Sequence, residues 1–312
     1  MGKILKNLKN MRHTLYKVCD AAHYPMPKWA ASLLRTGNGV PAPNVLAVET
    51  YDGSGQAVHP SVAEFRGKTF LALTPYPYGK EFYENPSLYC LEGEAWIPVA
   101  AMAPVVRAKT MGREHYSDPV LAAYEDQITL IYRRCDRRPE GKIDQLFWMD
   151  SGDGLHWSEP ALLAEAPGNQ LLSPAVDVQN RRLFCAETDP SVDSQVVYYD
   201  YRDGKLGEKH SCEVLGMEEG WFVWHMDVKR FEDGTLRGLF MLRRKHLRQI
   251  VSKLALFTWE EACWKWDRDV VWTPEEARPI QFVYKSTFAG EGRLLCSACD
   301  QKNRYYLFYK EI

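Results

Sequence analysis

A short pattern of polar and apolar residues recurs five times along the chain. Each copy begins with a polar residue, often followed by proline, and runs into apolar residues. A turn signal and two further strand-like apolar runs follow each copy, as in consecutive β-hairpins. The copies begin 52 to 60 residues apart, at His59, Asp118, Ser173, His225 and Lys285. A regular repeat built from strands predicts a β-propeller in which each copy forms one blade.

The last copy reaches the end of the chain after its third strand, whereas a propeller blade has four. An apolar run at residues 44–50, ahead of the first copy, can supply the outer strand and close the ring. The expected fold is therefore all-β, a five-bladed β-propeller over residues 44–312. Residues 1–43 are expected to form a short N-terminal helical extension, because their apolar residues follow a rough helical spacing. Whether this extension packs on the propeller or docks onto a partner stays open.

Composition narrows the class of partner. The formal net charge of −2 lacks the basic excess of a nucleic-acid-binding protein. No apolar stretch reaches the roughly 18 residues of a membrane span, and the basic N-terminus lacks the apolar run of a secretory signal, so a cytoplasmic location is expected. The 8 cysteines are scattered, and Cys296 and Cys299 would point to opposite faces of an extended strand. Neither a metal nor a cofactor is expected, and the oligomeric state stays open.

One turn motif carries a family resemblance. Residues 151–157 match the Ser-x-Asp-Gly-x-x-Trp turn, which resembles the Asp-box of sialidases. The aspartate of such a turn accepts backbone hydrogen bonds and the glycine permits a positive φ, so the motif indicates the fold and not the reaction. With Asp118 before Pro119 at a strand entry, the chain resembles the five-bladed furanosidase-like clan, which includes glycoside hydrolase families 32, 43 and 68.

The resemblance implies hydrolysis or transfer of glycosyl groups by acidic residues on inner strands, but two positions depart from the family pattern. Where family 43 places an aspartate general base before proline in the first blade, this chain has His59. Where the third blade of that family carries a glutamate general acid, this chain has Ser173 before Pro174. One or both catalytic carboxylates must therefore come from other positions, or hydrolysis is lost.

The alternating direction of blade strands gathers particular positions on one face, where first and third strands begin and second strands end. Three carboxylates fall on this face and are the candidate catalytic groups: Asp118 at a strand entry, Glu187 at the end of an apolar strand, and Asp227 beside His225. The candidate substrate-binding residues on the same face are charged, polar or aromatic: His59, Glu84, Arg133, Trp224, His225, Arg243 and Lys285.

These residues favour a glycan-processing enzyme, and first a glycoside hydrolase that acts on a saccharide through paired carboxylates. The cations on the predicted face favour an anionic saccharide, because arginine can bind a carboxylate or phosphate with two parallel hydrogen bonds. Two alternatives stay open. A propeller that lacks its base at position 59 would bind glycans without cleaving them, and the same cations suit phosphate in a phosphorylase-like enzyme.

Overall fold

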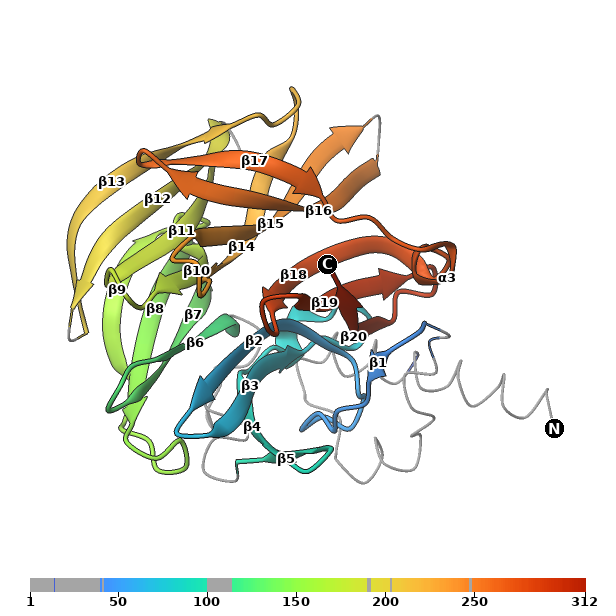
Figure 1. Ribbon diagram of the computed structural model, residues 1–312, viewed down its shortest axis with the longest axis horizontal. Coiled ribbons are helices and arrows are strands. Elements are labelled where there is room, and N and C mark those ends of the chain that lie inside the picture. The colour runs from blue at the N-terminus through green and yellow to red at the C-terminus, as the bar shows by residue number, and fades with distance from the viewer. Residues whose placement is uncertain are drawn as a thin grey trace.

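The computed structural model describes residues 14, 40, 42–99, 114–189, 192–202, 204–246 and 249–312. These parts of the chain are built almost entirely of β-strands (Figure 1), as the sequence predicted. Three short helical elements interrupt them: η1 (Pro77–Gly79), η2 (Glu81–Tyr83) and α3 (Pro274–Ala277). No helix within the described ranges is long and apolar enough to cross a membrane.

The described strands form four sheets. Two follow chain order: β2 (Ala57–Phe65), β3 (Lys68–Pro75), β4 (Ser87–Glu92) and β5 (Ala95–Pro98), then β6 (Glu114–Ala123), β7 (Ile128–Arg138), β8 (Gly141–Ser151) and β9 (Ala161–Pro167). The sheet nearest the C-terminus runs β18 (Ile280–Phe288), β19 (Arg293–Asp300), β20 (Tyr305–Glu311) and β1 (Val45–Leu46).

The fourth sheet has eight strands and consists of two antiparallel halves. The halves are β10 (Leu172–Asp177), β11 (Arg182–Asp189), β12 (Val192–Arg202) and β13 (Lys205–Leu215), and β14 (Phe222–Arg230), β15 (Leu236–His246), β16 (Gln249–Glu260) and β17 (Cys263–Asp269). They join through a short parallel pairing of β13 with β17 at their outer strands. Each half therefore repeats the hairpin order of the four-stranded sheets.

The first strands of these units lie nearest the middle of the molecule (Figure 1). They contact one another in a cycle, β2 with β6, β6 with β10, β10 with β14, β14 with β18, and β18 with β2. The apolar core lies between successive units. Phe70 and Leu130, for example, pack between the first two sheets, and Phe184, Phe240 and Trp264 pack between the halves of the large sheet.

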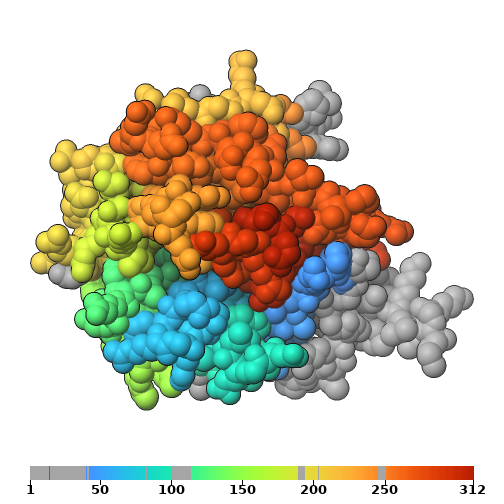
Figure 2. All heavy atoms as spheres, viewed as in Figure 1, coloured from blue at the N-terminus to red at the C-terminus, as the bar shows by residue number. Residues whose placement is uncertain are grey.

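The run ahead of the first repeat does supply an outer strand. Val45 pairs with Phe308 and Leu46 with Leu307, so β1 lies beside β20 at the edge of the last sheet. In Figure 2 the blue start of the described propeller segment accordingly lies against the red C-terminal residues. The helical extension predicted over residues 1–43 falls almost wholly outside the described residues.

The Asp-box-like turn joins β8 to β9, the outer hairpin of its sheet. Asp153 Oδ1 accepts the backbone N–H groups of Leu155 and His156, each at 2.8 Å. The indole N–H of Trp157 donates to the Gly154 carbonyl at 3.0 Å. Gly154 has a φ of +77°, and a Cβ there would lie 2.2 Å from the core ring of Phe70, so no other residue fits. The motif therefore builds a turn, as the sequence predicted.

Asp153→Ala is expected to lower the melting temperature by a few degrees, because two backbone N–H groups of the turn lose their acceptor. The variant should be measured by differential scanning calorimetry beside Asp126→Ala. Asp126 lies in the turn between β6 and β7, and its side chain makes no hydrogen bond within the described ranges. Loss of ligand binding by Asp153→Ala with unchanged stability would contradict a purely structural role for the turn.

Candidate active site

Three first strands carry a bulge at the same place. In β2, β6 and β10 two residues lie opposite one residue of the neighbouring strand. The first bulge residue is His59, Asp118 or Ser173, with φ of 54°, 51° and 53°, and proline follows each. A left-handed φ in such residues costs of the order of 1–3 kcal/mol, and bulges redirect side chains. The repeated sequence element therefore marks a β-bulge in each of these strands, and the bulge directs one side chain toward the neighbouring first strands.

The remaining two first strands vary this device. In β18 the bulge consists of Lys285 and Ser286. In β14 the extra residue is Trp224, because His225 still has a partner in the adjacent strand. His225 therefore stands one position later in its strand than Asp118 does, which corrects the equivalence that the sequence suggested. The sequence repeat did not reveal this shift, because the apolar pattern of β14 continues through Trp224.

A buried cluster forms where β2, β6 and β14 approach one another. His225 Nδ1 lies 3.1 Å from Asp118 Oδ1, and His59 Nε2 lies 3.6 Å from the same oxygen. His59 Nδ1 is 3.0 Å from the hydroxyl oxygen of Thr74, which fixes the orientation of the imidazole. The ring of Tyr284 lies 5.0 Å from both imidazoles. Three residues predicted from sequence, His59, Asp118 and His225, are thus in direct contact.

Arg133 neutralises Asp118. Its Nη1 atom lies 2.9 Å from Asp118 Oδ2, and its Nε atom lies 3.2 Å from Asp144 Oδ1. The hydroxyl of Ser117 also donates to Asp118 Oδ2, at 3.1 Å. Arg133, Asp118 and Asp144 are all buried. Arg133, predicted to bind substrate, is therefore already paired with two carboxylates of the protein.

Burial and neighbouring charges set the protonation states of the cluster. Burial alone would raise the pKa of Asp118, but attraction to His59, His225 and Arg133 holds that pKa well below its usual value. Burial lowers the pKa of His59 well below its ordinary value and that of His225 to about 4, although Asp118 opposes both shifts. Because Arg133 is permanently charged, it can balance Asp118 while both imidazoles stay neutral near pH 7.

The cluster contains buried atoms without hydrogen-bond partners among the described residues. They are His59 Nε2, Asp118 Oδ1 and both ring nitrogens of His225, although His225 Nδ1 and Asp118 Oδ1 lie only 3.1 Å apart. Buried polar atoms are nearly always paired, so a group of unpaired ones indicates a place for a ligand, water or ion. One ligand atom from each residue lies within 4.8 Å of the others. Neutral imidazoles and an ionised carboxylate are the forms that bind divalent cations.

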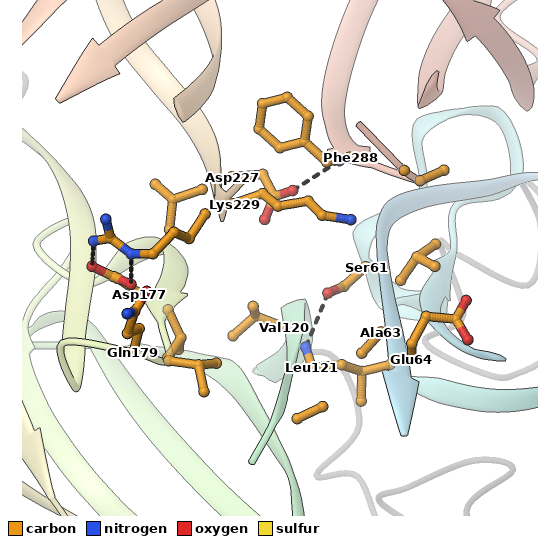
Figure 3. A pocket seen from close by; sticks show the side chains of 18 residues that line it. Ser61, Ala63, Glu64, Val120, Leu121, Asp177, Gln179, Asp227, Lys229 and Phe288 are labelled. Carbon is orange, nitrogen blue, oxygen red and sulfur yellow. Dashed lines mark hydrogen bonds and ion pairs between the residues drawn. The ribbon is translucent and has the colours of Figure 1, made fainter. Parts of the chain in front are cut away.

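Asp227 lies at a different hollow. A pocket of about 380 Å³ is lined by residues that follow the bulges in all five first strands, among them Ser61, Leu121, Asp177, Asp227 and Phe288 (Figure 3). Asp227 Oδ2 accepts hydrogen bonds from the hydroxyl of Thr287 at 2.8 Å and from the Phe288 N–H at 3.0 Å. Burial raises the pKa of Asp227 against these hydrogen bonds. The lining of this pocket does not include the cluster residues.

Glu187 faces the outer strands of its own sheet. Its carboxylate lies 2.6 Å from Lys209 Nζ in β13 and accepts a hydrogen bond from the Gln195 amide in β12 at 2.8 Å. Both contacts are made by residues of the same half of the large sheet, β10 to β13, to which Glu187 belongs. Within the described ranges, Glu187 makes no ion pair with the histidines of the cluster.

Lys285 is a buried cation between several first strands. Its ammonium group lies 3.4 Å from the carbonyl oxygen of Pro119 and 3.5 Å from that of Pro174. Burial lowers its pKa, whereas the negative charges of Asp118 and Asp227 oppose the shift. Lys285 is therefore coupled electrostatically both to the cluster and to the pocket at Asp227.

Sequence reasoning missed His115, a buried histidine that lies close to Glu84. His115 Nε2 lies 3.9 Å from Oε2 of Glu84, and both residues are buried. Burial and then the charge of Glu84 raise the pKa of Tyr284, whose ring contacts both cluster histidines. Glu84, predicted as a binding residue, thus lies near the cluster. His115 is the second residue of β6, three residues before Asp118, so the strand-entry rule contained the signal for it.

Arg243 and Trp224, both predicted binding residues, contact each other. The guanidinium carbon of Arg243 lies 4.3 Å from the centre of a Trp224 ring and 5.8 Å from that of Tyr284. In contrast to Arg133, Arg243 forms no ion pair with any described residue. Of the three predicted cations, Arg133 is paired with carboxylates and Lys285 lies against backbone carbonyl oxygens. Arg243 has no such partner among the described residues.

Comparison with known proteins establishes the fold. No protein-family model and no curated protein matches the sequence. Among solved structures, an N-acetylgalactosamine deacetylase from F. plautii in complex with blood group B trisaccharide superposes with a TM-score of 0.67 at 18% identity, over 86% of this chain and 94% of that one.

Two glycosidases superpose over similar lengths. A Penicillium chrysogenum α-L-arabinanase complexed with arabinobiose gives a TM-score of 0.55 at 12% identity, over 86% of this chain and 96% of that one. The Bombyx mori family 32 β-fructofuranosidase gives 0.57 at 12% identity, over 91% and 64%. The predicted resemblance in fold to the furanosidase-like propeller enzymes is therefore confirmed.

Proposed function

We propose that the chain is a five-bladed propeller enzyme that hydrolyses a bond in a glycan, with its reactive centre at Asp118 between His59 and His225. In this proposal residues 44–312 form the propeller and residues 1–43 a separate extension. The observation that carries it is the buried cluster of unpaired His59, Asp118 and His225 atoms. A propeller without chemistry would gain nothing from unpaired polar atoms at this position, because they cost stability.

The donor set suits a divalent cation. Two imidazoles and one carboxylate are ligands accepted by zinc, manganese and iron. Thr74 holds the His59 ring so that Nε2 faces Asp118, and Arg133 keeps Asp118 ionised. A cation bound here would act as a Lewis acid that polarises a substrate carbonyl and acidifies water. The protein would contribute orientation, charge and partial exclusion of bulk water by the half-buried ring of Tyr284.

Removal of an acyl group from an amino sugar is the reaction we place first. The F. plautii protein, which is a deacetylase of N-acetylgalactosamine, supports this choice through its fold similarity. The local geometry supports it as well, because Asp118 faces two histidines and an arginine. Glu187 and Asp227 make their hydrogen bonds elsewhere, which weakens a mechanism based on those three carboxylates.

Glycoside hydrolysis is the second candidate, favoured by one observation. Glu84 is buried near Arg133: burial lowers the pKa of Arg133, but the charges of Asp144, Asp118 and, more weakly, Glu84 raise it above its usual value. Asp118 and Glu84 would then be the pair of carboxylates that such a reaction requires. In this assignment Glu84 takes the place that the sequence analysis gave to Glu187 and Asp227, because Glu84 and Asp118 both act on the charge of Arg133.

The test is to titrate chelator-treated protein with Zn²⁺ and with Mn²⁺ by calorimetry. We expect one cation per chain, and affinity at least tenfold lower in His59→Gln and His225→Gln, as for loss of a ligand or its support. His210→Gln is the control, because that ring stacks on Tyr198 away from the cluster.

The two reactions give different products. Cation-dependent release of acetate from an N-acetylgalactosaminide supports the first candidate. Cation-independent cleavage of nitrophenyl glycosides, lost in Glu84→Gln, supports the second. A chain that binds neither cation and releases neither product would overturn the proposal and leave a glycan-binding propeller.

A further inference from the structure

Arg243 is a mostly enclosed cation next to the reactive centre. It lies in β15 opposite Phe222, and its guanidinium packs over Trp224. Tyr284 connects it to the centre, because that ring lies 5.8 Å from the guanidinium and 5.0 Å from the rings of both His59 and His225. A group held by Arg243 would therefore lie one aromatic ring away from the cluster.

The protein leaves this guanidinium without an anion. Several other arginines on these sheets do have one: Arg133 pairs with Asp118 and Asp144, and Arg230 pairs with Asp177. Within the described ranges Arg243 has no carboxylate within 4.0 Å and makes no hydrogen bond, and its buried Nε atom is among the unpaired ones. Aromatic faces stabilise a cation but cannot accept several N–H groups, so the described residues offer the fork of the guanidinium no hydrogen-bond acceptor.

We infer that Arg243 binds a negatively charged substituent of the substrate, a carboxylate or a phosphate, so that the substrate is an acidic saccharide. Such a group would accept two parallel hydrogen bonds from the fork and supply the missing charge. Trp224 and Tyr284 offer ring faces on which the attached sugar can stack. That the bound saccharide is the substrate rests on the proposed function. The anion site itself rests only on Arg243 and its surroundings.

The neighbouring Arg244 provides a matched control. It too lacks an acidic partner within the described ranges and packs on an indole, that of Trp221, at 4.8 Å. Successive residues of a strand point to opposite faces of the sheet, so Arg244 faces away from Tyr284 and the cluster. If any unpaired arginine on this protein sufficed to bind anions, the two residues would behave alike.

The experiment measures binding of matched probes by calorimetry, without turnover. The probes are glucuronate, glucose 6-phosphate, glucose and inorganic phosphate. We expect the two acidic sugars to bind at least tenfold more tightly than glucose, which corresponds to about 1.4 kcal/mol. Arg243→Met should abolish this preference, Arg243→Lys should retain part of it, and Arg244→Met should keep it. Comparison of glucuronate with glucose 6-phosphate identifies which oxyanion fits better.

Each outcome decides the inference. Equal binding of acidic and neutral sugars, no binding of any acidic probe, or an unchanged preference in Arg243→Met would each overturn it. Arg243→Met should melt near the temperature of the unsubstituted protein, and Arg243→Lys serves if it does not. A protein that prefers oxyanions through Arg243 but binds no Zn²⁺ or Mn²⁺ and releases no product would overturn the proposed function and leave the anion site standing.

Discussion

Asp118→Asn is expected to lower turnover by about a hundredfold or more, the scale seen when a charged catalytic group is neutralised. The variant keeps the shape of the side chain and can still accept hydrogen bonds from Ser117 and Arg133. Asparagine also tolerates the left-handed backbone at this position, where φ is 51°. The loss should therefore arise from the missing negative charge between His59 and His225. Acetate release and glycoside cleavage, corrected for folded protein, would measure it.

Asp177→Asn is the matched control for this variant. Asp177 is also a buried aspartate of a first strand, and its carboxylate lies 2.6 Å from Arg230 Nη2. It lines the pocket that also contains Asp227, and not the cluster. We expect Asp177→Asn to lose stability but to keep its turnover per folded molecule. Full activity in Asp118→Asn would remove Asp118 from the reaction, and equal losses in both variants would indicate a general effect of the missing ion pair.

Arg133→Met is expected to cost about 3–5 kcal/mol of unfolding free energy, as when one member of a buried ion network is removed. Arg133 is only 4% exposed, and without it Asp118 and Asp144 would each retain a buried charge. Methionine fills much of the same volume, so the loss should reflect charge and not an empty cavity. Urea unfolding at neutral pH would measure it.

Two further variants separate the causes. Arg230→Met removes a pair whose arginine side chain is 21% exposed, so a smaller loss is expected. Asp144→Asn added to Arg133→Met should restore part of the stability, because one unpaired charge disappears. If Arg133→Met loses no more than Arg230→Met, the cluster does not depend on Arg133 for its charge balance.

The strands could be predicted from the sequence because their signal is local. Alternation of apolar residues and turn residues at fixed places located β3, β7, β11, β15 and β19 after each first strand. The outer strand from Val45 and Leu46 was predictable by a count of missing strands. The parallel contact of β13 with β17 was not, because it joins two outer strands about 50 residues apart whose own repeats are already complete.

The site was predictable only in part. The strand-entry rule brought His59 and Asp118 together because a ring gathers equivalent positions, and it included His225 although that residue stands one position later in its strand. It could not predict that Arg133 forms ion pairs with Asp118 and Asp144 whereas Arg243 has no acidic partner among the described residues. Side-chain pairing of this kind depends on contacts in the folded protein that the repeat does not encode. Nor could the strand-entry rule separate Asp227 from His225: the two residues are two apart in a regularly paired stretch of β14, so alternation places them on the same side, and only the contacts of Asp227 with Thr287 and Phe288 show that it faces another pocket.

The bulges have a consequence for how such proteins diversify. Histidine, aspartate and serine occupy one and the same backbone conformation in β2, β6 and β10. Proline follows each of the three, so the same bulge forms around three different polar side chains. Each bulge therefore behaves as a socket that accepts different chemical groups without rebuilding the strand. We therefore expect that one polar residue at such a position can be replaced by another of similar conformational tolerance, which would change the chemistry that the strand presents and leave its hydrogen bonding as it is.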